Sequence, residues 1–242
     1  MTEIVLFVLL VTLGASFLFW AGNFTGARAT RKDGSLNKLK MQWEYQLLTL
    51  AVAIGLALIS IFVCGLKISF TGEIDAKATS MTLWGFGPDD TWATVGIVMA
   101  FIPAIATTLV VGIQMLKGQK ISLGLIPKAL ILGLPLALLN SLTEELIFRF
   151  LAINLLTGVV ASSTIAIASG IFFGLPHYFG SPGKLIGVVM AGALGWVMAN
   201  AMIETNGFAT SWFIHFVQDI PIIAMMLLTS FSSSQDSQKP LA

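Results

Sequence analysis

Three charged residues interrupt one of the most apolar stretches of the chain, in the segment NSLTEELIFRF at positions 140–150. They are Glu144, Glu145 and Arg149. An ionisable side chain inside a bilayer costs at least ~2.5–3.5 kcal/mol on insertion scales, so such residues usually serve a function. The structural alternative is an ion pair that holds one helix to another. Both interpretations are possible for this segment, and helix geometry decides which one suits each residue.

Helical spacing divides the three charges into a pair and a single carboxylate. Glu145 and Arg149 are four residues apart, so they share a helix face in the favoured order, with the glutamate first. Glu144 points about 100° away from Glu145, because a helix has about 3.6 residues per turn. Asn140 lies one turn earlier on the Glu144 face. We therefore predict a supporting ion pair for Glu145 and Arg149 and a chemical role for Glu144.

The two histidines of the chain lie in, or at the end of, apolar segments. His177 precedes the break GSPGK, a position that an interfacial histidine without a function also occupies. A helical hairpin with its turn near 157–163 would bring Glu144 and His177 to similar depth. His215 lies four residues before Asp219, so the two share a helix face. They form either an isolated structural His–Asp pair or an arrangement in which the carboxylate orients the imidazole for a catalytic role.

Carboxylates and imidazoles from three apolar segments suit hydrolysis. A carboxylate with a histidine can act as general base on water, and a second imidazole with a polar partner can stabilise an oxyanion. The H-E-x-x-H motif of zinc metalloproteases and the G-x-S-x-G motif of serine hydrolases do not occur in the chain.

Three alternatives to a metal-independent hydrolase remain open at this point. Glu144, His177 and His215 could hold a zinc ion with water as the fourth ligand. Glu144 and His177 could relay protons in a proton-coupled carrier, although no repeat halves or paired broken helices are visible. The chain could also be a non-catalytic immunity or scaffold protein that keeps the site residues.

The elements that must position these residues are transmembrane helices. The chain is 56% hydrophobic and 10% charged, whereas a soluble domain has about a quarter of its residues charged. We predict an all-α, polytopic transmembrane bundle of about seven spans. The spans lie near residues 3–22, 45–66, 92–113, 128–156, 160–178, 185–203 and 209–230. We treat residues 1–230 as one transmembrane domain with a motif-bearing core at 128–230, followed by a polar tail at 231–242.

Loop charges predict the orientation of the bundle. The segments 23–44 and 114–128 carry clusters of lysine and arginine, whereas the loop 67–91 is acidic. Positive-inside bias places 23–44, 114–128 and 178–184 in the cytoplasm. The net charge of +1 gives no case for nucleic acid, and the single cysteine, Cys64, excludes a disulfide framework within the chain.

Three motifs in order on successive predicted helices resemble the CPBP family, the CAAX-type proteases and bacteriocin-processing enzymes also called the ABI family. The motifs are Glu144-Glu145-x-x-x-Arg149, Phe173-x-x-x-His177 and His215-x-x-x-Asp219. They cover residues 144–219, and the first three spans match only in general hydropathy. The family includes the Ras-converting CAAX endopeptidases.

The resemblance implies an intramembrane, glutamate-dependent endopeptidase that needs neither a metal nor another cofactor. Glu144 and His177 would activate the attacking water, and His215 with Asp219 would form the oxyanion hole. The residues that we expect to support this site are Glu145, Arg149, Asn140 and Phe173. The implied partners are the lipid bilayer and a membrane protein or lipidated peptide substrate, CAAX-type or bacteriocin-related. The implied location is the cytoplasmic membrane of a prokaryote.

Asp219 departs from the residue that CAAX endopeptidases often carry at this position, which is asparagine. An amide can donate a hydrogen bond to an oxyanion, whereas an ionised carboxylate cannot. Asp219 would therefore have to be protonated to serve the oxyanion hole, or else orient His215.

Overall fold

The computed structural model of the chain describes residues 2–29, 35–119, 121–180 and 183–236. Within these ranges the secondary structure is helical, and the prediction of an all-α polytopic bundle is confirmed. The α-helices are α1 (Thr2–Ala29), α2 (Ser35–Cys64), α3 (Trp92–Leu116), α4 (Ile126–Glu145), α5 (Leu151–Leu156), α6 (Ser162–Gly174), α7 (Lys184–Thr205) and α8 (Phe208–Asp236).

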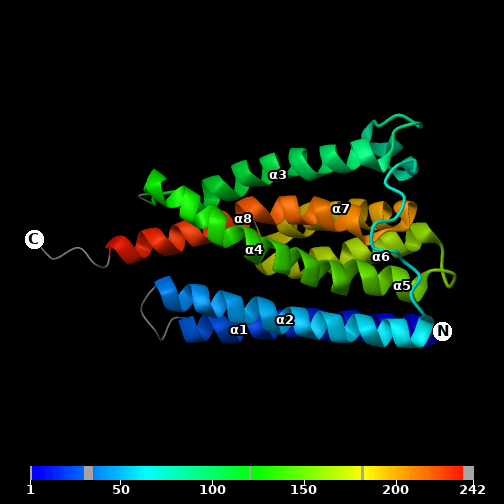
Figure 1. The fold of residues 1–242 in the computed structure, drawn as a ribbon, viewed down its shortest axis with the longest axis horizontal. Coiled ribbons are helices and arrows are strands. Elements are labelled where there is room, and N and C mark those ends of the chain that lie inside the picture. The colour runs from blue at the N-terminus through cyan, green and yellow to red at the C-terminus, as the bar shows by residue number, and fades with distance from the viewer. Residues whose placement is uncertain (1, 30–34, 120, 181–182, 237–242) are drawn as a thin grey trace, which may run out of the picture.

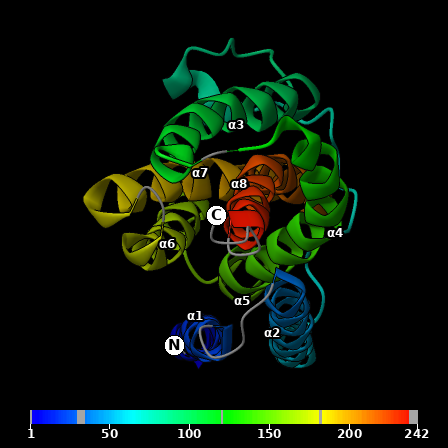
Figure 2. The same ribbon diagram turned by 90° about the vertical axis from the view of Figure 1, so that its left-hand side faces the viewer.

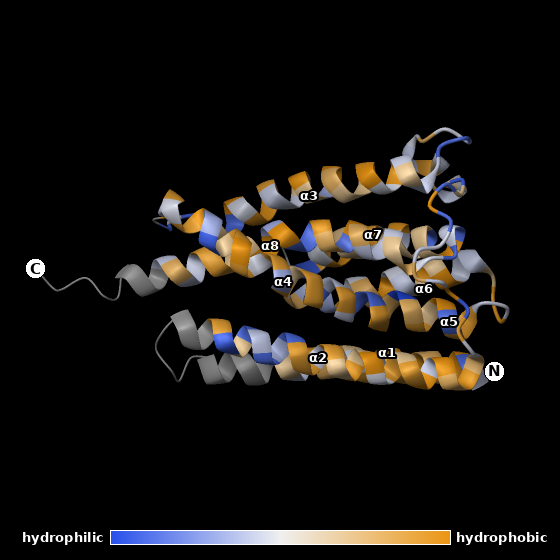
Figure 3. Ribbon diagram, viewed as in Figure 1, coloured by the Kyte–Doolittle hydropathy of each residue, from blue (hydrophilic) through white to orange (hydrophobic). Residues whose placement is uncertain are grey.

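Six helical segments of the described chain are long and apolar enough to cross a membrane. They are Thr2–Gly22, Leu39–Cys64, Trp92–Leu116, Leu123–Leu156, Lys184–Thr205 and Phe208–Ser232. Apolar side chains cover their outer faces, and Phe62, for example, is 91% exposed. The orange colour of the ribbon in Figure 3 shows that hydrophobic residues predominate along α1, α2 and α3. The chain is an integral, multi-pass membrane protein.

The predicted seventh span at 160–178 corresponds to a shorter α-helix followed by a 3₁₀ turn, which is not among the six long segments. The α-helix in this region, α6, has thirteen residues, and a 3₁₀ turn (Leu175–Phe179) follows it. Pro176 lies at the start of that turn, and a proline has no backbone N–H with which to continue an α-helix. Helix α8 continues to Asp236 and so includes the first residues of the predicted polar tail at 231–242; residues 237–242 lie outside the described residues.

The last helix, α8, lies at the centre of the bundle (Figure 2). The helices α3, α4 and α7 pack around it, α6 pairs with α7, and the antiparallel pair α1–α2 packs against α5. Glycines bring α6 and α7 close together, since a Cβ atom on Gly170 would lie 2.7 Å from the carbonyl oxygen of Gly192. The site residues of α8 are therefore enclosed by the other helices.

The ends of the helices agree with the predicted arrangement of the loops. In Figure 1 the end of α1, the start of α2, the junction of α3 and α4 and the end of α8 lie at one end of the bundle. The turn between α5 and α6 spans residues 157–161, inside the predicted range. The described parts of the two segments with the basic clusters, 23–29 with 35–44 and 114–119 with 121–128, thus lie at the same end of the bundle.

A π-helical turn (Leu146–Phe150) separates α4 from α5. It contains Phe148 and Arg149, both buried. Single π-helical turns inside α-helices occur frequently at functional sites. Here the turn directly follows the two adjacent glutamates, Glu144 and Glu145.

The loop between α2 and α3 is held against the junction of α7 and α8. The backbone N–H of Glu73 donates to the carbonyl oxygen of Thr205 at 2.7 Å, and Ser69 pairs with Gly207. The carboxylate of Glu204 accepts the indole N–H of Trp92 at 2.8 Å. This loop therefore covers the end of the bundle opposite the α1–α2 connection.

Candidate active site

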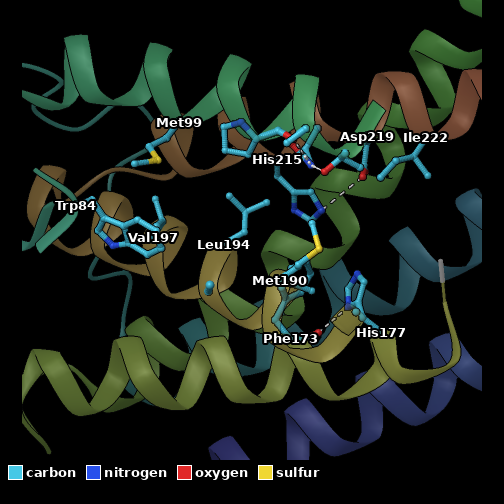
Figure 4. Close-up of a pocket in the computed structure, with 17 residues that line it drawn as sticks. Trp84, Met99, Phe173, His177, Met190, Leu194, Val197, His215, Asp219 and Ile222 are labelled. Atoms are coloured by element: carbon cyan, nitrogen blue, oxygen red, sulfur yellow. Dashed lines mark hydrogen bonds and ion pairs between the residues drawn. The ribbon is translucent and has the colours of Figure 1, made fainter. Parts of the chain in front are cut away.

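The predicted site residues come from three parts of the fold and meet beside α8. Glu144 and Glu145 end α4, His177 lies in the 3₁₀ turn after α6, and His215 and Asp219 lie on α8. Figure 4 shows the two imidazoles near one another, with Asp219 beside His215. Residues that are distant in the sequence thus form one cluster.

Glu145 and Arg149 form the predicted pair. The guanidinium Nε lies 3.4 Å from the Glu145 carboxylate, and both side chains are fully buried. The guanidinium also stacks on the ring of Phe173, with its carbon 3.7 Å from the ring centroid. The buried cation is thus neutralised by one neighbour and covered by another.

Glu145 also binds His215, a contact that helical spacing does not predict. Its Oε1 lies 2.7 Å from the His215 Nδ1, and its Oε2 accepts the hydroxyl of Ser211. A carboxylate only accepts, so Nδ1 must be the donor. This leaves the His215 Nε2 to face the reacting groups. A signal was present in the sequence, because Ser211, His215 and Asp219 are spaced by four and share one face of α8.

Glu144 lies on the other side of the His215 ring. Its Oε2 is 3.5 Å from the His215 Nε2, and its side chain is 18% exposed, against 0% for Glu145. In the described part of the chain Glu144 makes no hydrogen bond or ion pair with His177. The two carboxylates therefore differ as predicted in their access to water, although the imidazole beside Glu144 is His215.

Asn140 joins Glu144 to Asp219, which extends its predicted position near Glu144. Its Nδ2 donates to the Glu144 Oε1 at 3.2 Å and to the Asp219 Oδ2 at 3.0 Å. Its Oδ1 accepts from the Nε2 of Gln46 on α2 at 3.1 Å. This pattern fixes the Asn140 amide, since only its nitrogen can donate to carboxylates. Gln46 was not predicted, because nothing in its local pattern separates it from the other polar residues in the first half of α2.

Asp219 contacts His215 less closely than Glu145 does. Its Oδ1 lies 3.7 Å from the His215 Nε2, which exceeds the length of a hydrogen bond. Asp219 is nevertheless 94% buried, with its other oxygen bound to Asn140. The tightest contact that orients His215 therefore comes from Glu145 in this arrangement.

His177 is oriented by the residue one turn before it. Its Nδ1 lies 2.8 Å from the carbonyl oxygen of Phe173, so Nδ1 carries the proton and Nε2 is free to accept one. The Phe173 ring centroid lies 4.6 Å from that of His177 and 5.3 Å from that of His215. The Phe173 ring thus contacts Arg149 and both imidazoles.

Two cavities adjoin this cluster. One, of about 250 Å³, extends between α3, α7 and α8 from Trp84 to Asp219, and its lining includes both histidines (Figure 4). The other, of about 580 Å³, lies between α2, α4 and α8, and its lining includes Glu144 and Asp219. The Glu144 carboxylate and the two imidazoles therefore line different cavities, and Asp219 lines both.

The zinc site considered above requires at least three metal-ligating side chains around one point. Among the described residues, no group of three or more His, Cys, Asp or Glu side chains is placed to hold a metal ion. Glu144, His177 and His215 are near one another, yet within the described residues they do not form such a ligand set.

Residues 126–220 match a family model described as type II CAAX prenyl endopeptidase Rce1-like. This segment is Rce1-like. It runs from the start of α4 into α8 and includes every site residue from Asn140 to Asp219. The Rce1-like match confirms the resemblance to the CAAX protease family that the three motifs indicated. No curated protein and no solved structure matches the chain.

Proposed function

We propose that the chain is an intramembrane endopeptidase that uses Glu144 to activate water against a peptide bond. The observation that carries the proposal is the pairing of His215 with two unlike carboxylates. Glu145 is fully buried and binds Nδ1 at 2.7 Å, whereas Glu144 is partly exposed and lies 3.5 Å from Nε2. The Rce1-like match over the same residues supports this class of activity.

Glu144 is the general base of the proposed reaction. It lines the larger cavity, where a water molecule can reach its carboxylate. Glu144 takes one proton from that water as the oxygen adds to the carbonyl carbon of the substrate. When the carbon–nitrogen bond breaks, the same proton passes from Glu144 to the leaving nitrogen. Protons and electrons then balance without a further reagent.

His215 is the group that stabilises the oxyanion. The addition of water moves the carbonyl electron pair onto oxygen, and a donor placed in advance lowers the energy of that state. Glu145 holds the Nδ1 side of the ring, so a doubly protonated His215 presents the N–H of Nε2 to the oxyanion. Glu145 balances its positive charge. Asp219, on the same side of the ring, helps to position Nε2 in this proposal.

His177 positions the attacking water together with Glu144. Its Nδ1 proton is bound to the Phe173 carbonyl oxygen, so its Nε2 accepts a hydrogen bond from the second O–H of the water. Two acceptors hold the water with one lone pair directed at the substrate. In this scheme neither step uses a metal.

The substrate in this proposal is a membrane-associated peptide or protein. The cluster lies inside a bundle whose outer surface faces lipid, so a soluble peptide would have to leave water to reach it. The matched family is described as a CAAX prenyl endopeptidase, and we take a farnesylated C-terminal CAAX peptide as the first candidate substrate.

A cleavage assay with matched peptides tests this function. Purified protein in lipid nanodiscs is incubated with a farnesylated CAAX peptide, its unlipidated counterpart and a single transmembrane peptide, and the products are identified by mass spectrometry. We expect cleavage of at least one membrane-associated peptide by the wild type, and cleavage at least about 10²-fold slower by Glu144→Gln. Intact peptides in every wild-type reaction would refute the proposed activity for these substrate classes.

A further inference from the structure

The two cavities beside the site share two residues of α8, Asp219 and Ile222. They are three positions apart and are therefore neighbours on one face of the helix. Figure 4 shows Ile222 next to Asp219, at the end of the smaller cavity that is farthest from Trp84. Asp219 belongs to the cluster of site residues already described. Ile222 is a half-buried apolar side chain that has no role in the proposed catalytic steps.

The reacting groups are distributed between the cavities. Glu144 lines the larger cavity, whereas His177 and His215 line the smaller one. A peptide bond attacked by a water on Glu144 and stabilised by His215 must therefore occupy both spaces. The peptide passes Ile222 where it crosses from one cavity to the other.

The two spaces favour different chemistry on the two sides of that bond. The smaller cavity has a largely apolar lining that includes Met99, Met190, Leu194 and Val197. Its volume is about 250 Å³, and an apolar cavity of ~150 Å³ already holds a benzene molecule. The larger cavity includes the polar side chains of Gln42, Tyr45, Gln46 and Ser230. The smaller cavity is thus the less polar of the two and suits an apolar substrate side chain better.

We propose that Ile222 sets the size of the substrate side chain next to the cleaved bond. That side chain enters the smaller cavity, and the rest of the peptide continues past Ile222 into the larger one. This inference rests on the proposed function, since it assigns a specificity to the same site. Removing the Ile222 side chain enlarges the passage, and a larger side chain there narrows it.

Size selectivity gives a direct test. Internally quenched peptides carry alanine, leucine or phenylalanine at the two residues that flank the cleaved bond, and that bond is located by mass spectrometry. We expect Ile222→Ala to raise kcat/KM for the phenylalanine peptides relative to the alanine peptides about tenfold or more, because even one methylene in a pocket changes selectivity by about 10–200-fold. Ile222→Phe should shift the ratio in the opposite direction.

Ile220→Ala is the matched control. Ile220 lies on the same helix and packs against the buried apolar side chains between α4 and α8. It is not among the residues that line either cavity. We expect it to leave the ratio between large and small side chains unchanged. Equal changes for all peptides in both Ile222 variants would overturn the sizing role.

Binding separates this inference from the proposed function. The same peptides are titrated into Glu144→Gln and into Glu144→Gln combined with Ile222→Ala, with fluorescence anisotropy as the readout. If the wild type cleaves nothing but Ile222→Ala shifts the size preference in binding, the proposed function fails and the sizing role stands. If cleavage occurs with the same size preference in every Ile222 variant, the sizing role fails alone. Absence of binding by all peptides would also overturn it.

Discussion

The Glu145 carboxylate binds the His215 imidazole through Nδ1 at 2.7 Å, across 70 positions of the sequence. Glu145 also lies 3.4 Å from the Arg149 guanidinium. One buried carboxylate therefore holds a structural cation and an imidazole of the proposed active site. From this double contact we predict one effect on catalysis, through His215, and another on the stability of the fold, through Arg149.

Glu145→Gln should lower kcat strongly without preventing substrate binding. A glutamine side chain is neutral, so it no longer balances the positive charge of the doubly protonated His215 that presents the N–H of Nε2 to the oxyanion. The corresponding change in a serine protease triad costs about 10⁴-fold, and we expect a loss of about 10²–10⁴-fold. Ser211→Ala is the control, because it removes only one donor to Glu145 and should cost about tenfold or less. A Glu145→Gln protein with near-normal kcat would exclude this charge-balancing role.

Arg149→Met should reduce the stability of the fold. Removing one partner of a buried ion pair costs about 3–5 kcal/mol, because the other charge stays buried alone. The double variant Glu145→Leu with Arg149→Met should recover much of that stability but none of the activity, since His215 then has no carboxylate at Nδ1. Thermal unfolding in one detergent and the cleavage assay together measure both effects. Recovery of activity in the double variant would show that Glu145 acts only through Arg149.

Phe173→Leu should lower both stability and kcat. The substitution removes the ring on which Arg149 stacks, at a cost of about 2 kcal/mol for a desolvated cation–π contact, and it removes the edge contact with His215. Phe172→Leu is the matched control, because the neighbouring ring packs on Phe7 of α1 instead. Unfolding temperatures and kcat of the two variants should differ. Equal effects would contradict a specific role for Phe173.

Chelation should leave activity unchanged. In the proposed reaction the water is activated by Glu144 and His177 alone, so removal of divalent ions takes away no reacting group. The measurement is kcat/KM before and after treatment with a strong zinc chelator, followed by readdition of zinc. Loss of activity that zinc restores would favour the alternative in which Glu144, His177 and His215 hold a metal.

The sequence predicted the local features of the site because they follow from helical spacing. The Glu145–Arg149 pair, the position of Asn140 near Glu144 and the turn between α5 and α6 all depend on residues close together in the chain. Each is present in the structure. Hydropathy likewise predicted the long spans, since each must cover the apolar core of the bilayer by itself.

The contacts between helices could not be predicted in the same way. The Glu145–His215 and Gln46–Asn140 hydrogen bonds depend on the rotation of one helix against another, which the spacing within each helix does not determine. The π-helical turn at 146–150 also changes the facing of the residues that follow it. Hydropathy did not reveal the shortness of α6, because the apolar residues continue through Pro176 into the 3₁₀ turn.

The most direct test of the proposed mechanism is the kcat/KM of Glu144→Gln on the membrane-associated peptide that the wild type cleaves. The substitution preserves the shape of the side chain and removes its capacity to take a proton from water. We predict a loss of about 10²–10⁴-fold, the usual contribution of a general base, with unchanged peptide binding. A Glu144→Gln protein that cleaves the peptide as fast as the wild type would contradict the mechanism.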